Sequence, residues 1–242
     1  MPSAPGPRGP ALPRSTDLGS LGDRLLLLNL KAYPGHLGKG AVRIARLLEK
    51  VGEESGVPVA IAPPLPDLAR VAEEVRIPVL AQHVDPGEAG ARTGAVPVEA
   101  IEAARARGSL VNHSERPLPV EDIEEVVRRL SARHLVAVVC AADVPQAQRL
   151  AETRPPYLAI EPPELIGGDR AVSTARPEVV SGTVSAVHSV APGTRVLCGA
   201  GVHDRRDVSR ALELGTVGIL VSSAVTRAPD AERALRELLS GF

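Results

Sequence analysis

The sequence predicts a single domain of the α/β class, a (β/α)8 barrel, and three observations lead to this fold. Eight short apolar segments are each followed by a segment with helical patterning, in a regular alternation that begins at Leu25. The apolar segments carry apolar residues on both faces, which is typical of parallel strands covered on both sides. Polar residues follow most of them, and no GxGxxG motif follows the first, so a closed barrel is favoured over an open doubly wound sheet.

The expected elements alternate from the first apolar segment to the last helix. The strands are expected at 25–30, 57–62, 77–81, 109–112, 135–140, 157–161, 195–199 and 217–221. The helices are expected at 39–54, 65–75, 98–107, 120–132, 144–152, 177–190, 206–214 and 230–239.

The composition supports a full core and argues against several classes of partner. Hydrophobic residues make up 44% of the 242 positions but aromatic residues only 1%, so Val, Leu, Ile and Ala must fill the interior. With no Trp and one Phe, the chain lacks the stacking surfaces that single-stranded nucleic acid requires. The formal net charge of -1 argues against a general polyanion binder and leaves room for a small phosphate site. We therefore expect no nucleic-acid partner.

Two cysteines and the absence of long apolar runs indicate a cytoplasmic protein. Cys140 and Cys198 lie in apolar, strand-like segments and are expected to be buried free thiols in a reducing compartment. No His or Cys cluster has the spacing of a metal site. No apolar run is long enough to span a bilayer, so no membrane association is expected.

The chain is expected to divide into an N-terminal extension and one barrel domain. Residues 1–23 are rich in Pro, Gly, Ala and Ser and contain no apolar stretch of the signal-peptide kind. They are predicted to form a disordered extension, or to follow from a start codon placed too early. Residues 24–242 form the predicted barrel domain.

The most informative stretch begins with the sixth strand, expected at 157–161. Glu161 lies at its end, because Pro162 and Pro163 cannot donate to a sheet ladder. The next residues, 165–168, are two apolar residues followed by two glycines. A carboxylate beside such a loop is typical of a general base beneath a lid. The competing interpretation is a glutamate in a solvated loop.

Polar residues also follow the first and fourth strands. Strand alternation puts Asn29 and Lys31 on one face, so both are expected to point into the barrel mouth. A lysine there is costly unless it meets an anion, and the alternative is a lysine that extends to the solvated rim. His113 follows the fourth strand, as a catalytic group or as a hydrogen-bonded loop histidine.

Small residues follow the last two strands. Gly201, Ser222 and Ser223 would let backbone N–H groups approach an oxyanion, and barrels commonly bind phosphate at this position. The GAG sequence that ends at Gly201 is by itself a weak signal, since it usually marks a tight turn.

Together these segments resemble the triosephosphate isomerases, most closely their compact archaeal-type form. The resemblance covers residues 26–242. Its motifs are NLKAY (29–33), AQHVDP (81–86), NHSE (112–115), AIEPPELIG (159–167), VLCGAG (196–201) and ELGTVGILVSS (213–223).

The resemblance implies interconversion of dihydroxyacetone phosphate and D-glyceraldehyde 3-phosphate without a metal or an organic cofactor. Glu161 would be the base, neutral His113 would polarise the carbonyl oxygens, and Lys31 would hold negative charge on the enediolate and the phosphate. The implied substrate-binding set is Asn29, Leu30, Lys31, Ile166, Gly201, Ser222 and Ser223.

The resemblance also implies a homodimer, or a homotetramer built from dimers. The connection between the third strand and the next helix, residues 85–96, is long and polar. Thr93 and Gly94 match the tip of the family's loop at this position, which enters the neighbouring subunit. The alternative is a mobile surface loop.

Three short segments depart from the family pattern. Residues 203–206 and 169–170 are more charged than expected, and Ser173-Thr174 replaces a Ser-Lys pair. Two alternatives stay open, and these departures motivate the first of them. One is an isomerase of another small sugar phosphate, such as a tetrulose phosphate, and the other is a non-catalytic barrel that binds a phosphate ligand.

Overall fold

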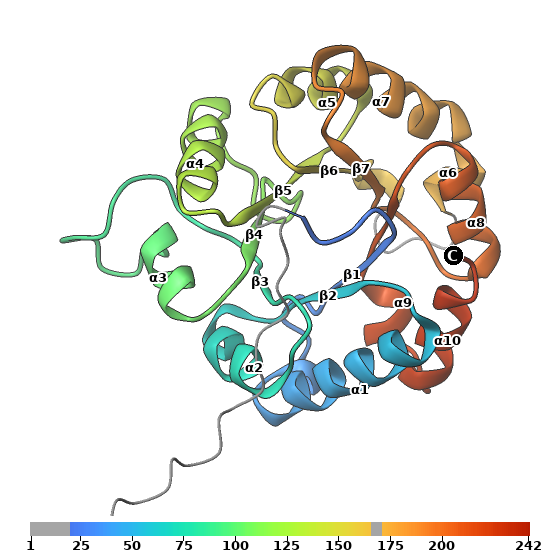
Figure 1. Ribbon diagram of the computed structural model, residues 1–242, viewed down its shortest axis with the longest axis horizontal. Helices are drawn as coiled ribbons and strands as arrows, with labels where there is room; N and C mark the ends of the chain where they lie inside the picture. Colours follow the sequence, from blue (N-terminus) through green and yellow to red (C-terminus); the bar gives the residue numbers. More distant parts are fainter. Residues whose placement is uncertain (1–19, 166–170) are drawn as a thin grey trace, which may run out of the picture.

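The protein forms a (β/α)8 barrel in the computed structural model, which describes residues 20–165 and 171–242 (Figure 1). The described strands are β1 (Leu25–Asn29), β2 (Val59–Ala62), β3 (Leu80–Ala81), β4 (Gly108–Val111), β5 (Val136–Ala141), β6 (Tyr157–Ile160), β7 (Arg195–Cys198) and β8 (Gly218–Val221). They form one parallel sheet in the order β2-β1-β8-β7-β6-β5-β4-β3. A bridge between Ile61 and Val79 joins the first and last strands of this order, so the sheet curves into a barrel. The predicted fold class is confirmed.

Helices surround the barrel on the outside (Figure 1). The described helices are α1 (Lys39–Ser55), α2 (Leu68–Glu74), α3 (Val98–Ala103), α4 (Val120–Ala132), α5 (Val144–Ala151), α6 (Val172–Ala175), α7 (Pro177–Val190), α8 (Arg205–Glu213), α9 (Ser223–Thr226) and α10 (Ala231–Leu239). Single 3₁₀ turns are η1 (Pro34–His36), η2 (Leu65–Asp67) and η3 (Pro163–Leu165). Within the described ranges, no helix has the length and apolar character needed to cross a membrane.

The differences from the predicted elements are short. The third strand was expected at 77–81, but β3 contains two residues, because Pro78 has no N–H to give to a ladder. The Pro78 carbonyl instead accepts a hydrogen bond from the Ile61 N–H at 3.0 Å. Helices α6 and α9 were not predicted, since four residues are too few to establish a helical period.

The core has two layers, set by the alternation of side chains along each strand. Leu25 and Leu27 of β1 point into the barrel, whereas Leu26 and Leu28 belong to the larger cluster between the strands and the helices. Every residue of β1 is buried. As the composition predicted, small aliphatic side chains fill both layers, and Tyr157 is the largest fully buried side chain.

Tyr157 anchors the described start of the chain at the amino end of the barrel. Its hydroxyl accepts a hydrogen bond from the Leu21 N–H at 2.8 Å and donates one to the Gly22 carbonyl at 2.8 Å. The Leu21 side chain is buried in the inner core layer. Residues 20–23, which precede the expected start of the domain, therefore contact the barrel. Residues 1–19 lie outside the described part.

Candidate active site

A cavity at the carboxyl ends of the strands contains most of the predicted site residues. It is lined by Asn29, Lys31, His113, Glu161, Gly199, Gly201, Val202, Leu220, Val221, Ser222 and Ser223. These residues come from the ends of β1, β4, β6, β7 and β8, which lie far apart in the sequence. Convergence at this end of a parallel barrel is the arrangement in which such folds carry their active sites. Two predicted residues are not part of this lining. Leu30 is fully buried in the outer core layer, and Ile166 lies outside the described residues.

Glu161 is a buried carboxylate that follows β6 directly. Its N–H donates to the Ala141 carbonyl at 2.8 Å, and the next residue, Pro162, ends the pairing with the sheet. The residue is 4% exposed, and its Oε2 atom has no hydrogen-bond partner among the described residues. Burial raises the pKa of the Glu161 carboxyl above its ordinary value, because desolvation disfavours the charged form. His113, the Cys140 thiol and Lys31 lower this pKa without cancelling the effect of burial.

Gly199 makes room for the Glu161 side chain. A Cβ atom placed on Gly199 would lie 2.4 Å from Cγ of Glu161 and 3.1 Å from its Oε1. The first distance is too short for any real contact with a Cβ atom, and the neighbour is the buried carboxylate itself. The first glycine after β7 is therefore required by the position of Glu161.

Lys31 reaches the cavity through a left-handed turn. Its φ is +50°, and its N–H donates to Oδ1 of buried Asn29 at 2.9 Å. Strand alternation was expected to bring both side chains to the mouth, but β1 ends at Asn29, so alternation no longer governs residue 31. Both side chains line the cavity, and the cause is the hydrogen-bonded turn.

Lys31 has an anionic partner that the sequence motifs did not reveal. Its Nζ atom lies 2.6 Å from Oε1 of Glu115, with side-chain exposures of 14% for the lysine and 56% for the glutamate. Glu115 belongs to the NHSE motif, in which the sequence predicts only His113 as a site residue. The cost of placing a lysine at a barrel mouth is a signal that could have prompted a search for a nearby carboxylate.

His113 is buried and held on a turn that fixes the roles of its two nitrogens. The Glu115 N–H donates to Nδ1 of His113 at 3.2 Å, so Nδ1 is the acceptor and a neutral ring carries its proton on Nε2. The Nε2 atom lies 3.7 Å from Oε1 of Glu161. An N–H donor and a carboxylate therefore face each other at the mouth of the barrel.

Small residues from the ends of β7 and β8 line another part of the cavity. Gly201 has a φ of +67°, a conformation that favours glycine. Ser222 and Ser223 lie at the start of α9, and Oγ of Ser222 is buried without a hydrogen-bond partner among the described residues. With Val202, Leu220 and Val221, these residues complete the described lining of the cavity.

Among the charged departures at 203–206, Asp204 has a local structural explanation. Asp204 caps α8, since its Oδ1 atom accepts hydrogen bonds from the N–H groups of Arg206 and Asp207. Thr174 also donates to Oδ1 of Asp207, at 2.9 Å, which links α6 to α8. None of these residues lines the cavity. Asp169 and Arg170 lie outside the described residues.

Both cysteines are free and buried, as predicted. Burial raises the pKa of the Cys198 thiol to about 12 and that of the Cys140 thiol well above its ordinary value. Both side chains are therefore protonated near neutral pH and are poor nucleophiles. In the part of the chain that the structure describes, no group of three or more His, Cys, Asp or Glu side chains could hold a metal ion.

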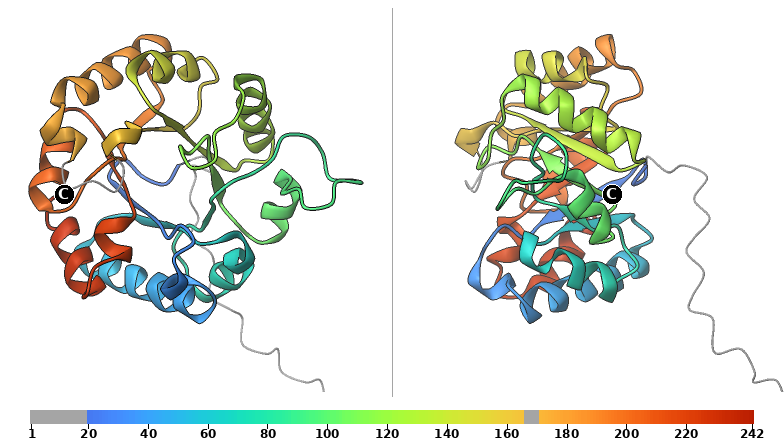
Figure 2. Two further views of the ribbon diagram at one scale, coloured as in Figure 1. Left: turned by 180° about the vertical axis from the view of Figure 1, so that it is seen from behind. Right: turned by 90° about the vertical axis from the view of Figure 1, so that its left-hand side faces the viewer.

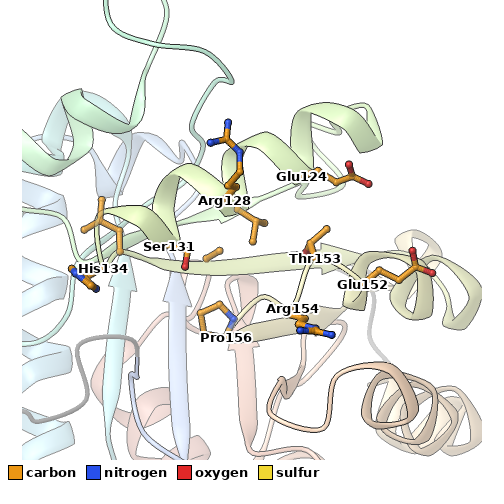
Figure 3. Close-up of a pocket in the computed structure, with 11 residues that line it drawn as sticks. Glu124, Arg128, Ser131, His134, Glu152, Thr153, Arg154 and Pro156 are labelled. Carbon is orange, nitrogen blue, oxygen red and sulfur yellow. The ribbon is translucent and has the colours of Figure 1, made fainter.

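A second hollow, of about 620 Å³, lies on the outside of the barrel between α4 and the segment after α5 (Figure 3). Its rim carries Glu124, Arg128, His134, Glu152 and Arg154. Figure 3 shows these side chains pointing in different directions, so they do not converge on a common point. None of the predicted site residues lines this hollow.

A (β/α)8 barrel with a carboxylate, a histidine and a lysine gathered at the carboxyl ends of its strands has the arrangement typical of barrel enzymes. A family model described as triosephosphate isomerase matches residues 24–238. The chain belongs to the triosephosphate isomerase family.

Relatives named triosephosphate isomerase are similar to almost the whole chain. Those from Methanothermus fervidus and Methanosarcina acetivorans are each 46% identical, over 89% and 90% of this chain and 97% and 99% of the relatives. One from Caldivirga maquilingensis is 46% identical over 88% of this chain and 95% of its own length. The family resemblance that the sequence motifs indicated is confirmed.

Proposed function

We propose that this protein is a triosephosphate isomerase, which interconverts dihydroxyacetone phosphate and D-glyceraldehyde 3-phosphate through an enediolate. The observation that best supports this function is the cavity in which Nε2 of His113 lies 3.7 Å from Oε1 of Glu161, with Lys31 in the same lining. Isomerisation needs a base, an electrophile and a cation around one small substrate, and these three side chains supply them.

Glu161 acts as the general base in this proposal. The carboxylate removes a proton from the carbon next to the carbonyl and returns it to the neighbouring carbon. Desolvation raises the pKa of the carboxyl, which makes the carboxylate a stronger base than a solvated one. A glutamate base working beside a neutral histidine is the arrangement established for the triosephosphate isomerase family, and these roles are carried over from it.

His113 and Lys31 stabilise the charge that develops on the substrate. With Nδ1 accepting the Glu115 N–H, the Nε2–H of a neutral His113 donates to the carbonyl oxygen, which becomes the enediolate oxygen. The Lys31 ammonium balances negative charge on the enediolate and on the phosphate. Asn29 fixes the backbone of Lys31 by accepting its N–H, which orients the lysine toward the substrate.

The substrate phosphate binds at the wall formed by Gly201, Ser222 and Ser223. Short side chains at these positions let the backbone N–H groups approach the phosphate oxygens. Ile166 would contribute from the loop after β6, in keeping with the family pattern. The phosphate is then held at the ends of β7 and β8, and the reactive carbons lie within reach of Glu161.

A coupled assay tests the proposed function directly. Purified protein is mixed with D-glyceraldehyde 3-phosphate, and an NADH-dependent dehydrogenase reports the dihydroxyacetone phosphate that forms. We expect turnover in the ordinary enzymatic range, about 1–10³ per second. A tetrulose phosphate serves as the matched alternative substrate. Turnover of the tetrulose phosphate alone, or of neither compound, would reject the proposal.

The tight packing of Gly199 against Glu161 leads to a prediction. Gly199→Ala should lower kcat by roughly 10-fold to 10²-fold, since a misplacement of about 1 Å can cost 10²-fold. Gly193→Ala is the matched control, because a Cβ atom there meets nothing within 4 Å. Steady-state kinetics on both variants, with a melting curve for each, decide the matter. A Gly199→Ala enzyme as active as Gly193→Ala would show that the Glu161 position tolerates the added methyl group.

We also propose that the protein assembles through the loop between β3 and α3. The neck of this loop is closed by two hydrogen bonds, from the Asp85 N–H to the Val96 carbonyl at 2.8 Å and from the Val96 N–H to Oδ2 of Asp85 at 2.7 Å. Its tip, residues 88–94, is exposed and extends away from the barrel beside α3 (Figures 1 and 2). Docking of this tip onto a second copy would give a homodimer, or a homotetramer built from dimers.

Thr93→Arg tests the assembly. In the family this loop packs beside the catalytic lysine of the neighbouring subunit, which corresponds to Lys31. A bulky charge in that buried contact should dissociate the dimer and lower kcat at least about tenfold, because Lys31 loses its support from the second subunit. Ser189→Arg on α7, which is also exposed, is the control. Light scattering coupled to size exclusion is run beside the activity assay. A fully active wild-type monomer at micromolar concentration would end this proposal.

We place the protein in the cytoplasm, in glycolysis and gluconeogenesis. Two free, buried thiols are compatible with a reducing compartment, and triose phosphates are intermediates of that metabolism.

A further inference from the structure

We propose that Asn112 is a positioning residue, whose side-chain amide holds the turn that carries His113 in the geometry needed for catalysis. This inference rests on the proposed isomerase function, in which His113 is the electrophile. Asn112 follows β4 directly and is 7% exposed. It does not line the cavity, so it acts through its neighbour.

The backbone of Asn112 makes the sharp turn that brings His113 to the cavity. Its φ is +60°, in the left-handed region, where asparagine is several-fold enriched among residues other than glycine. The chain leaves the direction of β4 at this residue, and the next side chain lies over the barrel mouth. The conformation favours Gly, Asn or Asp at this position.

The side chain of Asn112 ties both ends of the turn. Its Nδ2 donates to the Cys140 carbonyl on β5 at 2.9 Å, and its Oδ1 accepts from the Leu118 N–H at 3.0 Å. The turn between these ends is closed by the Arg116 N–H, which donates to the His113 carbonyl at 2.7 Å. One amide thus connects the start of the turn, its end and the neighbouring strand.

Among the amino acids that tolerate this backbone conformation, only asparagine can also make both side-chain hydrogen bonds. Glycine suits the backbone but has no side chain, and aspartate keeps the acceptor for Leu118 while losing the donor for the Cys140 carbonyl. Loss of the donor leaves a buried carbonyl without its partner. The turn then becomes more mobile, and the Nε2 atom of His113 is placed less precisely. Catalysis suffers because this atom must lie within hydrogen-bond distance of a substrate oxygen.

The first experiment compares two glycine variants. Asn112→Gly should lower kcat by about 10-fold to 10²-fold, with KM changed far less, since the lost precision acts on the transition state. Arg105→Gly is the matched control, because Arg105 is an exposed residue with a φ of +61° that does not line the cavity. It should leave kcat and KM unchanged. Asn112→Asp, which is isosteric, should also lose kcat and serves if Asn112→Gly does not fold.

The second experiment asks whether the effect passes through His113. In a His113→Ala background, adding Asn112→Gly should lower kcat by much less than it does in the wild type, because the group being positioned is gone. If Asn112→Gly lowers kcat by the same factor in the His113→Ala background as in the wild type, Asn112 has a purely structural role and the proposal is overturned. Unchanged kcat in both Asn112 variants would overturn it as well.

A third readout separates this inference from the proposed function. The ring resonances of His113, assigned by comparison with His113→Ala, should shift or broaden in Asn112→Gly and stay in place in Arg105→Gly. This holds even if the wild type fails to isomerise triose phosphates. Unmoved His113 resonances in Asn112→Gly would reject the inference whatever the substrate.

Discussion

Glu161→Ala is expected to lower kcat by at least about 10²-fold, the usual contribution of a general base. The carboxylate is buried, lies 3.7 Å from Nε2 of His113 and has a pKa raised by burial, as a base in a dry site requires. KM should change far less than kcat, because the carboxylate acts mainly in the transition state. Steady-state kinetics in both reaction directions measure the two quantities.

The matched control for this experiment lies three residues further along the chain. Glu164 is half exposed and pairs with Arg176 at 2.5 Å on the surface, so Glu164→Ala removes a carboxylate from the same segment without touching the cavity. Its kcat should equal that of the wild type. A Glu161→Ala enzyme that keeps more than about half of the wild-type kcat would remove Glu161 from the mechanism.

The second large effect is an expected difference in kinetics between Lys31→Ala and His113→Ala. Lys31→Ala should raise KM and lower kcat together, since the ammonium charge attracts the phosphate of the bound substrate as well as the transition state. His113→Ala should act mostly on kcat, by about 10²-fold or more, because its Nε2–H meets charge that develops only during the reaction. The two variants therefore differ in KM.

Full kinetic curves for these two variants, with Lys39→Ala as the control, test the distinction. Lys39 is exposed at the start of α1 and does not line the cavity, so its replacement should leave both constants unchanged. If Lys31→Ala and His113→Ala give the same kinetic pattern with KM untouched, Lys31 is a structural rim lysine. Its ion pair with Glu115 would then be its principal role.

The fold could be predicted from the sequence because the strands of this barrel are covered on both sides. Strands such as β1, in which all five residues are buried and the first four are leucines, contain continuous apolar runs that are easy to find. Elements without a period could not be found in this way, as the four-residue helices α6 and α9 illustrate. β3 is shorter than the expected strand because Pro78 cannot donate a hydrogen bond to the sheet. Whether that missing donor matters depends on which strand lies beside it.

The main residues of the candidate site could be predicted from the sequence, but the contacts between them could not. Glu161, His113 and Lys31 each follow a strand, and parallel strands in a barrel end at one mouth. The partnership of Lys31 with Glu115 spans 84 positions of sequence and depends on barrel closure. The left-handed backbone at Lys31 accompanies a local hydrogen bond to the Asn29 side chain, a turn that the sequence analysis did not consider. At Asn112 the side chain also bonds the Cys140 carbonyl on β5, a contact that depends on the pairing of the strands.

The most direct test of the enediolate mechanism is isotope exchange during isomerisation. Dihydroxyacetone phosphate is incubated with the wild-type enzyme in D₂O, and the products are read by proton NMR. The carboxylate holds the abstracted proton before returning it, and in a fraction of the turnovers that proton is replaced by deuterium from the solvent. Some of the D-glyceraldehyde 3-phosphate should therefore carry deuterium at the carbon next to its aldehyde. Glu161→Ala should form this product at least about 10²-fold more slowly. Rapid formation of product without any deuterium would indicate direct hydride transfer and would contradict the enediolate mechanism.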